Sequence, residues 1–187
     1  MKNKLTIGQF QRITDIDNDI SNPLHHRLMT LSVLTDKEED VLRSMSFVEL
    51  QNETDKVNKE WDYEVKEIPR KTKLEINGKV YFPITDLQKI TAGQLIDKSY
   101  MAAEEKDIIP NLHTIAAIIC RDNKREYSTK DFEERSLFLQ QHCLAEDIYS
   151  IAVFFCKIVM KLPSLLPQME KMKNQINLQK SGDGLSS

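Results

Sequence analysis

Cysteine and histidine are the residues of this chain best suited to metal binding or nucleophilic catalysis, and it has three cysteines and four histidines. The cysteines lie in apolar helical patterns without C-x-x-C spacing, so we interpret them as reduced, buried side chains. They are Cys120, Cys143 and Cys156. His25 and His26 are adjacent, whereas a zinc-binding pair on a helix needs i, i+4 spacing. Local spacing therefore predicts no metal site.

A cysteine–histidine nucleophile is the other chemistry these side chains could perform. His113 lies in an apolar helical run and could meet Cys120 or Cys143 in space. Nothing in the sequence marks either cysteine as exposed or electropositive, which a low thiol pKa requires. We therefore interpret His113 as a core or helix-end histidine. Such a pair, and a metal site assembled from distant segments, remain the less favoured alternatives.

Three alternating aspartates resemble the start of a calcium-binding loop. Asp15, Asp17 and Asp19 have the right spacing, but the sixth and twelfth loop positions hold Ile20 and His26 instead of Gly and Glu. The segment is better interpreted as a polar linker between helices. The chain also lacks a glycine-rich phosphate loop. We therefore predict that it is not an enzyme and has no cofactor.

Charge and hydropathy restrict the class of partner. A net charge of -3 disfavours nucleic acid, since proteins that bind phosphate backbones usually present a basic face. The most apolar stretch, Ile148 to Leu162, is shorter than the roughly 20 residues of a membrane-spanning helix. The N-terminal residues form no apolar signal region. We therefore expect a protein of the cytoplasm that binds neither nucleic acid nor membrane.

Helix starts are the most frequent local signal in the chain. Four segments have the reciprocal capping-box pattern, in which a Ser or Thr and a Glu or Gln three residues later bond each other's backbone N–H. These are Thr6–Gln9, Thr35–Glu38, Ser46–Glu49 and Thr91–Gln94. After the third box, Phe47, Leu50, Thr54, Val57 and Trp61 fall along one helical face. An apolar run from Leu112 to Cys120 predicts a core helix.

One segment has the alternation of a β-hairpin. Asn77-Gly78 separates two β-rich runs, so a two-residue type I′ turn is predicted within residues 72–84. Pro83 cannot donate a backbone hydrogen bond, which predicts that this part of the second strand lies at a sheet edge. Tyr81 and Phe82 would then be available for strand addition by a partner. The predicted fold is mainly α (α+β), a helical bundle with one inserted hairpin.

The C-terminal part is predicted to be separate from the bundle. We assign residues 1–165 to a single helical domain with the hairpin, and residues 166–187 to an amphipathic helix and a flexible tail. Met169, Met172 and Ile176 share one face of that helix and form a second candidate partner-binding set. For both sets, packing on the chain's own core is the alternative.

The ordered set of motifs resembles the tail assembly chaperone-like proteins of tailed bacteriophages. The resemblance covers roughly residues 4–165, and it depends on the order and spacing of five motifs rather than on any one. They are Thr6-Ile7-Gly8-Gln9-Phe10, Leu31-Ser32-Val33-Leu34-Thr35, Leu74-Glu75-Ile76-Asn77-Gly78-Lys79, Ile90-Thr91-Ala92-Gly93-Gln94-Leu95-Ile96-Asp97 and Asn111-Leu112-His113-Thr114-Ile115-Ala116. No functional residue of the family is transferred to this chain.

This resemblance implies a non-enzymatic role in virion morphogenesis. Such chaperones hold the tape measure protein, or its tail tube partner, until the tube polymerises. The expected partner is therefore a tape measure or tail tube protein, and the expected location is the cytoplasm of the host cell or the virion. A structural or cargo protein of the particle is one alternative, and a host-directed regulatory binding protein is another. The sequence does not specify an oligomeric state.

Overall fold

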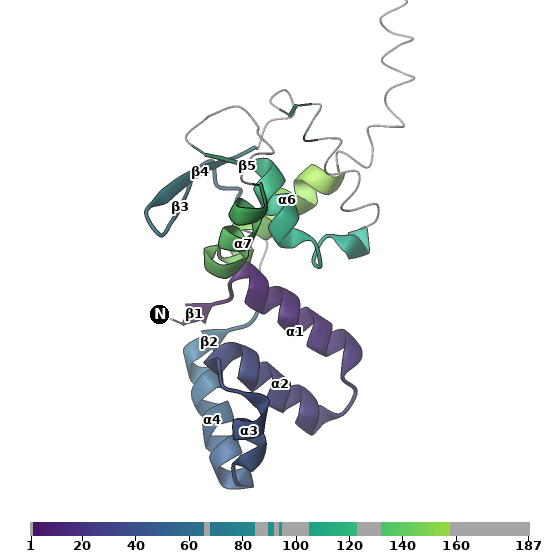
Figure 1. The fold of residues 1–187 in the computed structure, drawn as a ribbon, viewed down its shortest axis with the longest axis vertical. Helices are drawn as coiled ribbons and strands as arrows, with labels where there is room; N and C mark the ends of the chain where they lie inside the picture. The colour runs from purple at the N-terminus through teal and green to yellow at the C-terminus, as the bar shows by residue number, and fades with distance from the viewer. Residues whose placement is uncertain are drawn as a thin grey trace, which may run out of the picture.

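The structure is a computed structural model, and it describes residues 2–65, 68–84, 90–91, 94, 105–122 and 132–157. The described part is mostly helical (Figure 1), with helices α1 (Ile7–Asp19), α2 (Pro23–Thr35), α3 (Glu39–Ser44), α4 (Phe47–Glu60), α6 (Leu112–Ile119) and α7 (Phe132–His142). Residues 145–157 are also helical. The strands are β1 (Asn3–Lys4), β2 (Trp61–Asp62), β3 (Leu74–Ile76), β4 (Lys79–Pro83) and β5 (Cys120–Asp122). A small antiparallel sheet beside these helices confirms the predicted mainly α (α+β) class.

Three of the four predicted capping boxes are confirmed. Thr6 Oγ1 accepts the Gln9 N–H at 3.2 Å, and the Gln9 side chain accepts the Thr6 N–H at 3.0 Å. The same reciprocal hydrogen bonds form in the boxes Ser46–Glu49 and Thr91–Gln94. Each box satisfies two backbone donors that the first helical turn leaves without a partner inside the helix.

The capping box predicted at Thr35 is wrong, because α2 continues through this residue. Thr35 Oγ1 donates to the Leu31 carbonyl at 2.8 Å, a bond within α2. The helix ends at Asp36, whose φ of 55° places it in the left-handed region, which aspartate tolerates better than most residues. α3 then begins at Glu39 without a side-chain cap.

The predicted hairpin is confirmed. β3 and β4 pair antiparallel with Ile76 opposite Lys79, so only two residues form the turn between them. Both have positive φ, 47° at Asn77 and 75° at Gly78, as a type I′ turn requires.

β4 is the central strand between β3 and β5, so the second hairpin strand as a whole is not an edge strand. Its pairing with β3 ends at Tyr81, so among the described residues the part at Pro83 pairs only with β5, and the edge predicted for this part is confirmed on the β3 side. β5 begins at Cys120, a residue that the apolar pattern had assigned to a helix. Ile84 donates to the Ile119 carbonyl at 3.0 Å on the β5 side. Since N–H groups alternate between the two sides of a strand, the nitrogen of Pro83 faces the other side, beyond the end of β3. The missing donor therefore breaks no β4–β5 bond.

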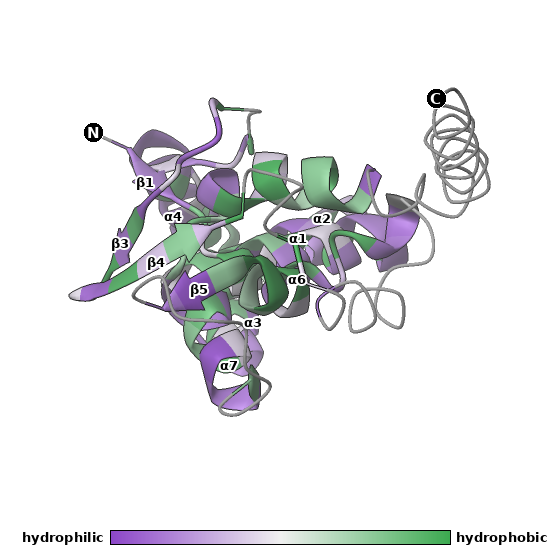
Figure 2. Ribbon diagram, turned by 90° about the horizontal axis from the view of Figure 1, so that it is seen from above, coloured by the Kyte–Doolittle hydropathy of each residue, from purple (hydrophilic) through white to green (hydrophobic). Residues whose placement is uncertain are grey.

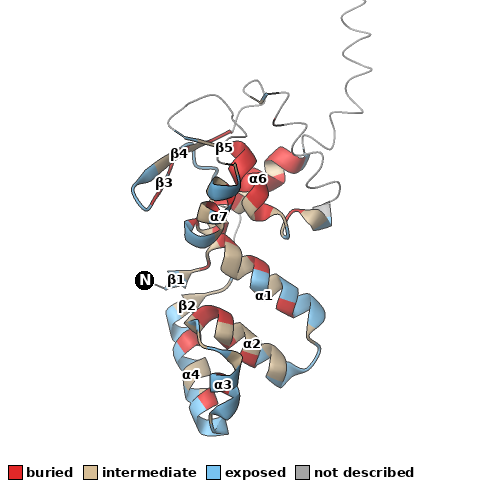
Figure 3. Ribbon diagram, viewed as in Figure 1, coloured by how far each residue is buried: buried red, intermediate tan, exposed pale blue. Residues whose placement is uncertain are grey.

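The buried apolar residues form two clusters (Figure 3). The smaller cluster joins α2, α3 and α4, and its members are Leu5, Leu28, Leu31, Leu34, Leu42, Leu50 and Val57. The larger cluster joins α6, α7, the sheet and residues 145–157. Helix α1 lies between them, since it contacts α2 on one side and α6 and α7 on the other (Figure 1). Phe10 of α1 packs against both clusters.

α6 is the centre of the larger cluster. Its residues from Ile115 to Ile119 are all 0% exposed, which matches the apolar run seen in the sequence. Viewed from above, α6 is hydrophobic along its length, whereas α7 presents hydrophilic residues (Figure 2). A helix that is apolar on all sides is stable in water only when other elements surround it.

The N-terminus is bound to a segment far away in the sequence. Ile7 N–H donates to the Cys143 carbonyl, and Ala145 N–H donates to the Leu5 carbonyl, both at 2.9 Å. Gly8 allows this close approach, because a Cβ at this position would lie 3.1 Å from the Gln140 carbonyl oxygen. The link joins the start of α1 to the end of α7.

No helix within the described residues is long and apolar enough to cross a membrane.

Candidate binding surface

The structure places the predicted hairpin site mainly inside the protein. Tyr81 is 4% exposed, and its ring lies 6.2 Å from that of Phe138. Burial raises the pKa of the Tyr81 hydroxyl to about 12. Phe82 is half-buried on the opposite face of β4. The expectation of an exposed Tyr81 on an open edge is therefore corrected, and a partner contact by Phe82 stays a prediction.

The second predicted set, Met169, Met172 and Ile176, lies outside the described residues, as does the predicted domain boundary at residue 165. Their role in partner binding stays a prediction.

The cysteines are buried, as the apolar pattern indicated. Burial raises the pKa of the Cys143 thiol to about 12 and that of Cys120 well above its ordinary value. Both therefore stay protonated near neutral pH, and a thiol is a poor nucleophile. Among the described residues, no group of three His, Cys, Asp or Glu side chains could hold a metal ion.

A buried amide network joins α1, α7 and the start of α6. Gln11 is 6% exposed, and its Nε2 lies 2.8 Å from the Ile109 carbonyl, 2.7 Å from the Pro110 carbonyl and 2.9 Å from His113 Nδ1. Gln140 Nε2 donates to Gln11 Oε1 at 3.1 Å. We did not predict this network, although Gln11 shares the helical face of Ile7 and so falls on the buried stripe of α1. Its effect is to fix α1 against α6 and α7.

A groove of about 840 Å³ is lined in part by Gln11, His113 and Gln140 of this network. Its lining mixes amides, charges and apolar side chains, among them Gln9, Arg12, Asp15, Val33 and Gln141. Gln9, Gln11 and Gln140 already hydrogen-bond within the protein. The groove therefore offers few side-chain amides that do not already have a role in the fold.

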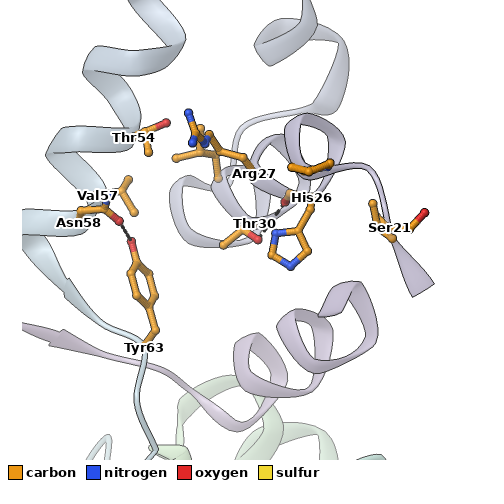
Figure 4. A pocket seen from close by; sticks show the side chains of 11 residues that line it. Ser21, His26, Arg27, Thr30, Thr54, Val57, Asn58 and Tyr63 are labelled. Carbon is orange, nitrogen blue, oxygen red and sulfur yellow. Dashed lines mark hydrogen bonds between the residues drawn. The ribbon is translucent and has the colours of Figure 1, made fainter. Parts of the chain in front are cut away.

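A second groove, of about 520 Å³, lies between α2 and α4 (Figure 4). Leu31 and Val57 contribute apolar surface to it, and Tyr63 lies on the side nearest β2. Tyr63 Oη donates to the Asn58 side chain at 3.0 Å. His26 Nε2 lies 2.6 Å from an Asp17 oxygen, which binds the start of α2 to the end of α1. These polar side chains bond one another and present no convergent set for a small ligand.

The exposed large apolar side chains are Leu24, Val41, Phe47 and Val48 on helices α2–α4 and Leu137 on α7. Helices α3 and α4 lie at the end of the molecule away from the three-stranded sheet (Figure 1). Phe47 and Val48, in the first turn of α4, are 70% and 66% exposed, and Val41 of α3 is also exposed. We call these three residues the α3–α4 corner. A groove of about 340 Å³ between α2 and α3 is lined by Leu24, Leu28 and His25 of α2 and by Arg43 of α3, the helix that carries Val41. Apolar side chains exposed next to one another are typical of protein-binding sites.

The position of the α3–α4 corner is held by local hydrogen bonds. The Ser46–Glu49 capping box orders the first turn of α4, to which Phe47 and Val48 belong. Phe47 lies on the same helical face as Leu50 and Val57, yet it is 70% exposed. Leu50 and Val57 of the same stripe are buried in the smaller cluster, but Phe47 begins the helix and extends beyond the residues that could cover it.

The segment of the sequence that contains the corner is acidic. Residues 36–55 contain seven acidic and two basic residues, a net charge of −5, although the whole chain carries only -3. Both basic residues are already in ion pairs, Lys37 with Glu53 at 2.7 Å and Arg43 with Glu39 at 2.6 Å. The acidic residues are Asp36, Glu38, Glu39, Asp40, Glu49, Glu53 and Asp55. The corner therefore combines exposed apolar side chains with negative charge.

Comparison with known proteins provides no relative from which a function could be transferred. No protein-family model matches the chain, and no curated protein and no solved structure matches it.

Proposed function

We propose that this chain is a non-enzymatic phage morphogenesis protein that holds a tail component, the tape measure or the tail tube protein, as an assembly chaperone. Its motif order resembles the tail assembly chaperone-like proteins. The observation that supports binding most directly is the α3–α4 corner, where Phe47 and Val48 are exposed on an ordered helical turn. A surface of this kind favours contact with apolar segments of another protein.

The experiment is mass spectrometry of two samples from infected cells. The first is what co-purifies with a tagged copy of the chain during tail assembly, and the second is the purified mature particle. We expect the tape measure or tube protein in the first sample and no copy of this chain in the second. A mock purification with the tag alone is the control for background.

Stoichiometric presence in mature particles would replace the chaperone by the structural or cargo alternative. Recovery of host proteins without any tail protein would favour the host-directed alternative. The two samples therefore separate all three functions that the sequence left open.

A further inference from the structure

We propose that the α3–α4 corner binds a positively charged amphipathic helix of the partner protein. This inference rests on the proposed function and names the class of segment that is bound. The corner is helical, and strand addition needs an open sheet edge, so an extended partner strand has no backbone to pair with here. A helix in contrast docks through side chains, which is what Val41, Phe47 and Val48 offer.

The groove between α2 and α3 supports the same mode of binding. Leu24 and Leu28 of α2 line one side, and Arg43 of α3 lines the other, within about 340 Å³. Leu24 is 53% exposed, so the groove presents apolar surface at its entrance. An apolar side chain of a docked helix can enter such a groove, as in other helix-in-groove complexes.

The negative charge of residues 36–55 determines the sign of the charge expected on the partner helix. The net charge of −5 over residues 36–55 attracts a cationic helix and repels an anionic one. It also repels nucleic acid and membranes of anionic lipid. A helix with leucines on one face and lysines on the other therefore complements both properties of the corner.

Three synthetic peptides and the full-length chain test the proposal. Two designed helices share the same leucine face, and their polar faces are all lysine in one and all glutamate in the other. Binding is measured by fluorescence anisotropy at low and at physiological salt. We expect the lysine peptide to bind at least about tenfold more tightly than the glutamate peptide, with a difference that narrows as salt screens the charges.

Matched variants locate the binding site. The double variant Phe47→Ala/Val48→Ala should bind the lysine peptide about tenfold more weakly, since truncating an interface anchor typically costs this much affinity. Leu137→Ala is the control, because Leu137 is 56% exposed on α7, away from the corner. Circular dichroism should show unchanged folding, because none of the three side chains is buried. Glu38→Lys/Asp40→Lys should reduce the preference for lysine over glutamate.

Several results would overturn the proposal. These are equal binding of both designed peptides, or an equal loss of binding in the Leu137→Ala control.

The third peptide is residues 161–180 of this chain, an apolar segment with four lysines and one glutamate. If it binds the corner more tightly than the lysine helix, the occupant is a second copy of this chain and not a partner protein. If tail proteins still co-purify with Phe47→Ala/Val48→Ala, the corner inference fails while the proposed function stands.

Discussion

At the residue scale, burial and the neighbouring amide of Gln11 both favour the neutral ring of His113. An amide nitrogen has two hydrogens, yet Gln11 Nε2 lies within 2.9 Å of two carbonyl oxygens and of His113 Nδ1. His113 Nδ1 can only accept a hydrogen bond from this donor, so the neutral ring fits and the doubly protonated ring does not. Burial acts in the same direction, because it lowers the pKa of His113 below its ordinary value.

This geometry predicts a pH-dependent stability. In the unfolded chain His113 has its ordinary pKa of 6.5, so below this pH the unfolded state takes up a proton before the folded state does. The free energy of unfolding should therefore fall as the pH is lowered through 6.5, until the folded state is protonated as well. Urea titrations between pH 7.5 and 5 should show a smaller fall in the free energy of unfolding for His113→Gln than for the wild type. Equal falls in both proteins would contradict this prediction.

At the element scale, the hairpin depends on backbone conformation rather than on contacts of the turn. Gly78 has a φ of 75°, and a Cβ added there would meet no atom within 4 Å. Gly78→Ala should therefore destabilise the protein by about 1 kcal/mol through left-handed strain alone. Asn77→Gly is the matched control, and it should cost little because glycine adopts positive φ freely. Thermal unfolding measures the stability of both variants, and an equal loss of stability in Asn77→Gly would contradict the argument.

Helix α4 offers a second test at this scale. Ser46 Oγ accepts the Glu49 N–H, and Ser46 is exposed, so Ser46→Ala removes the cap without creating a cavity. We expect a loss of about 1 kcal/mol in the free energy of unfolding. The lysine peptide should also bind more weakly, because the turn that presents Phe47 would fray. Stability lost without any change in peptide binding would show that the cap does not order the corner.

At the scale of the whole molecule, α1 couples the two hydrophobic clusters. The single tryptophan, Trp61, packs against the smaller cluster, so its fluorescence reports on that cluster alone. Ile115→Ala creates a cavity in the larger cluster and should cost about 2–5 kcal/mol. Because Phe10 packs against both clusters, Trp61 fluorescence and far-ultraviolet circular dichroism should shift to lower denaturant together.

Separate midpoints for the two signals in Ile115→Ala would contradict this coupling, since they would show that the clusters unfold independently. Leu137→Ala is the control, because its exposed side chain should leave both midpoints in place.

The sequence by itself determined the features that depend on neighbouring residues. The capping boxes at Thr6, Ser46 and Thr91 and the Asn77-Gly78 turn were predicted correctly, because their bonds and dihedrals involve residues within three positions of one another. The mostly helical class and the core character of α6 followed from local periodicity in the same way.

Only the tertiary structure decided which surfaces are covered. β4 became a central strand because β5 pairs with it from about 40 residues further along the chain. Tyr81 is buried because its side chain packs in the larger cluster beside Phe138 of α7. Phe47 shares a helical face with the buried Leu50 and Val57, but no described segment packs over the first turn of α4. Periodicity shows which side chains share a face, whereas burial of that face depends on distant segments that fold against it. The position of the candidate binding surface therefore required the fold.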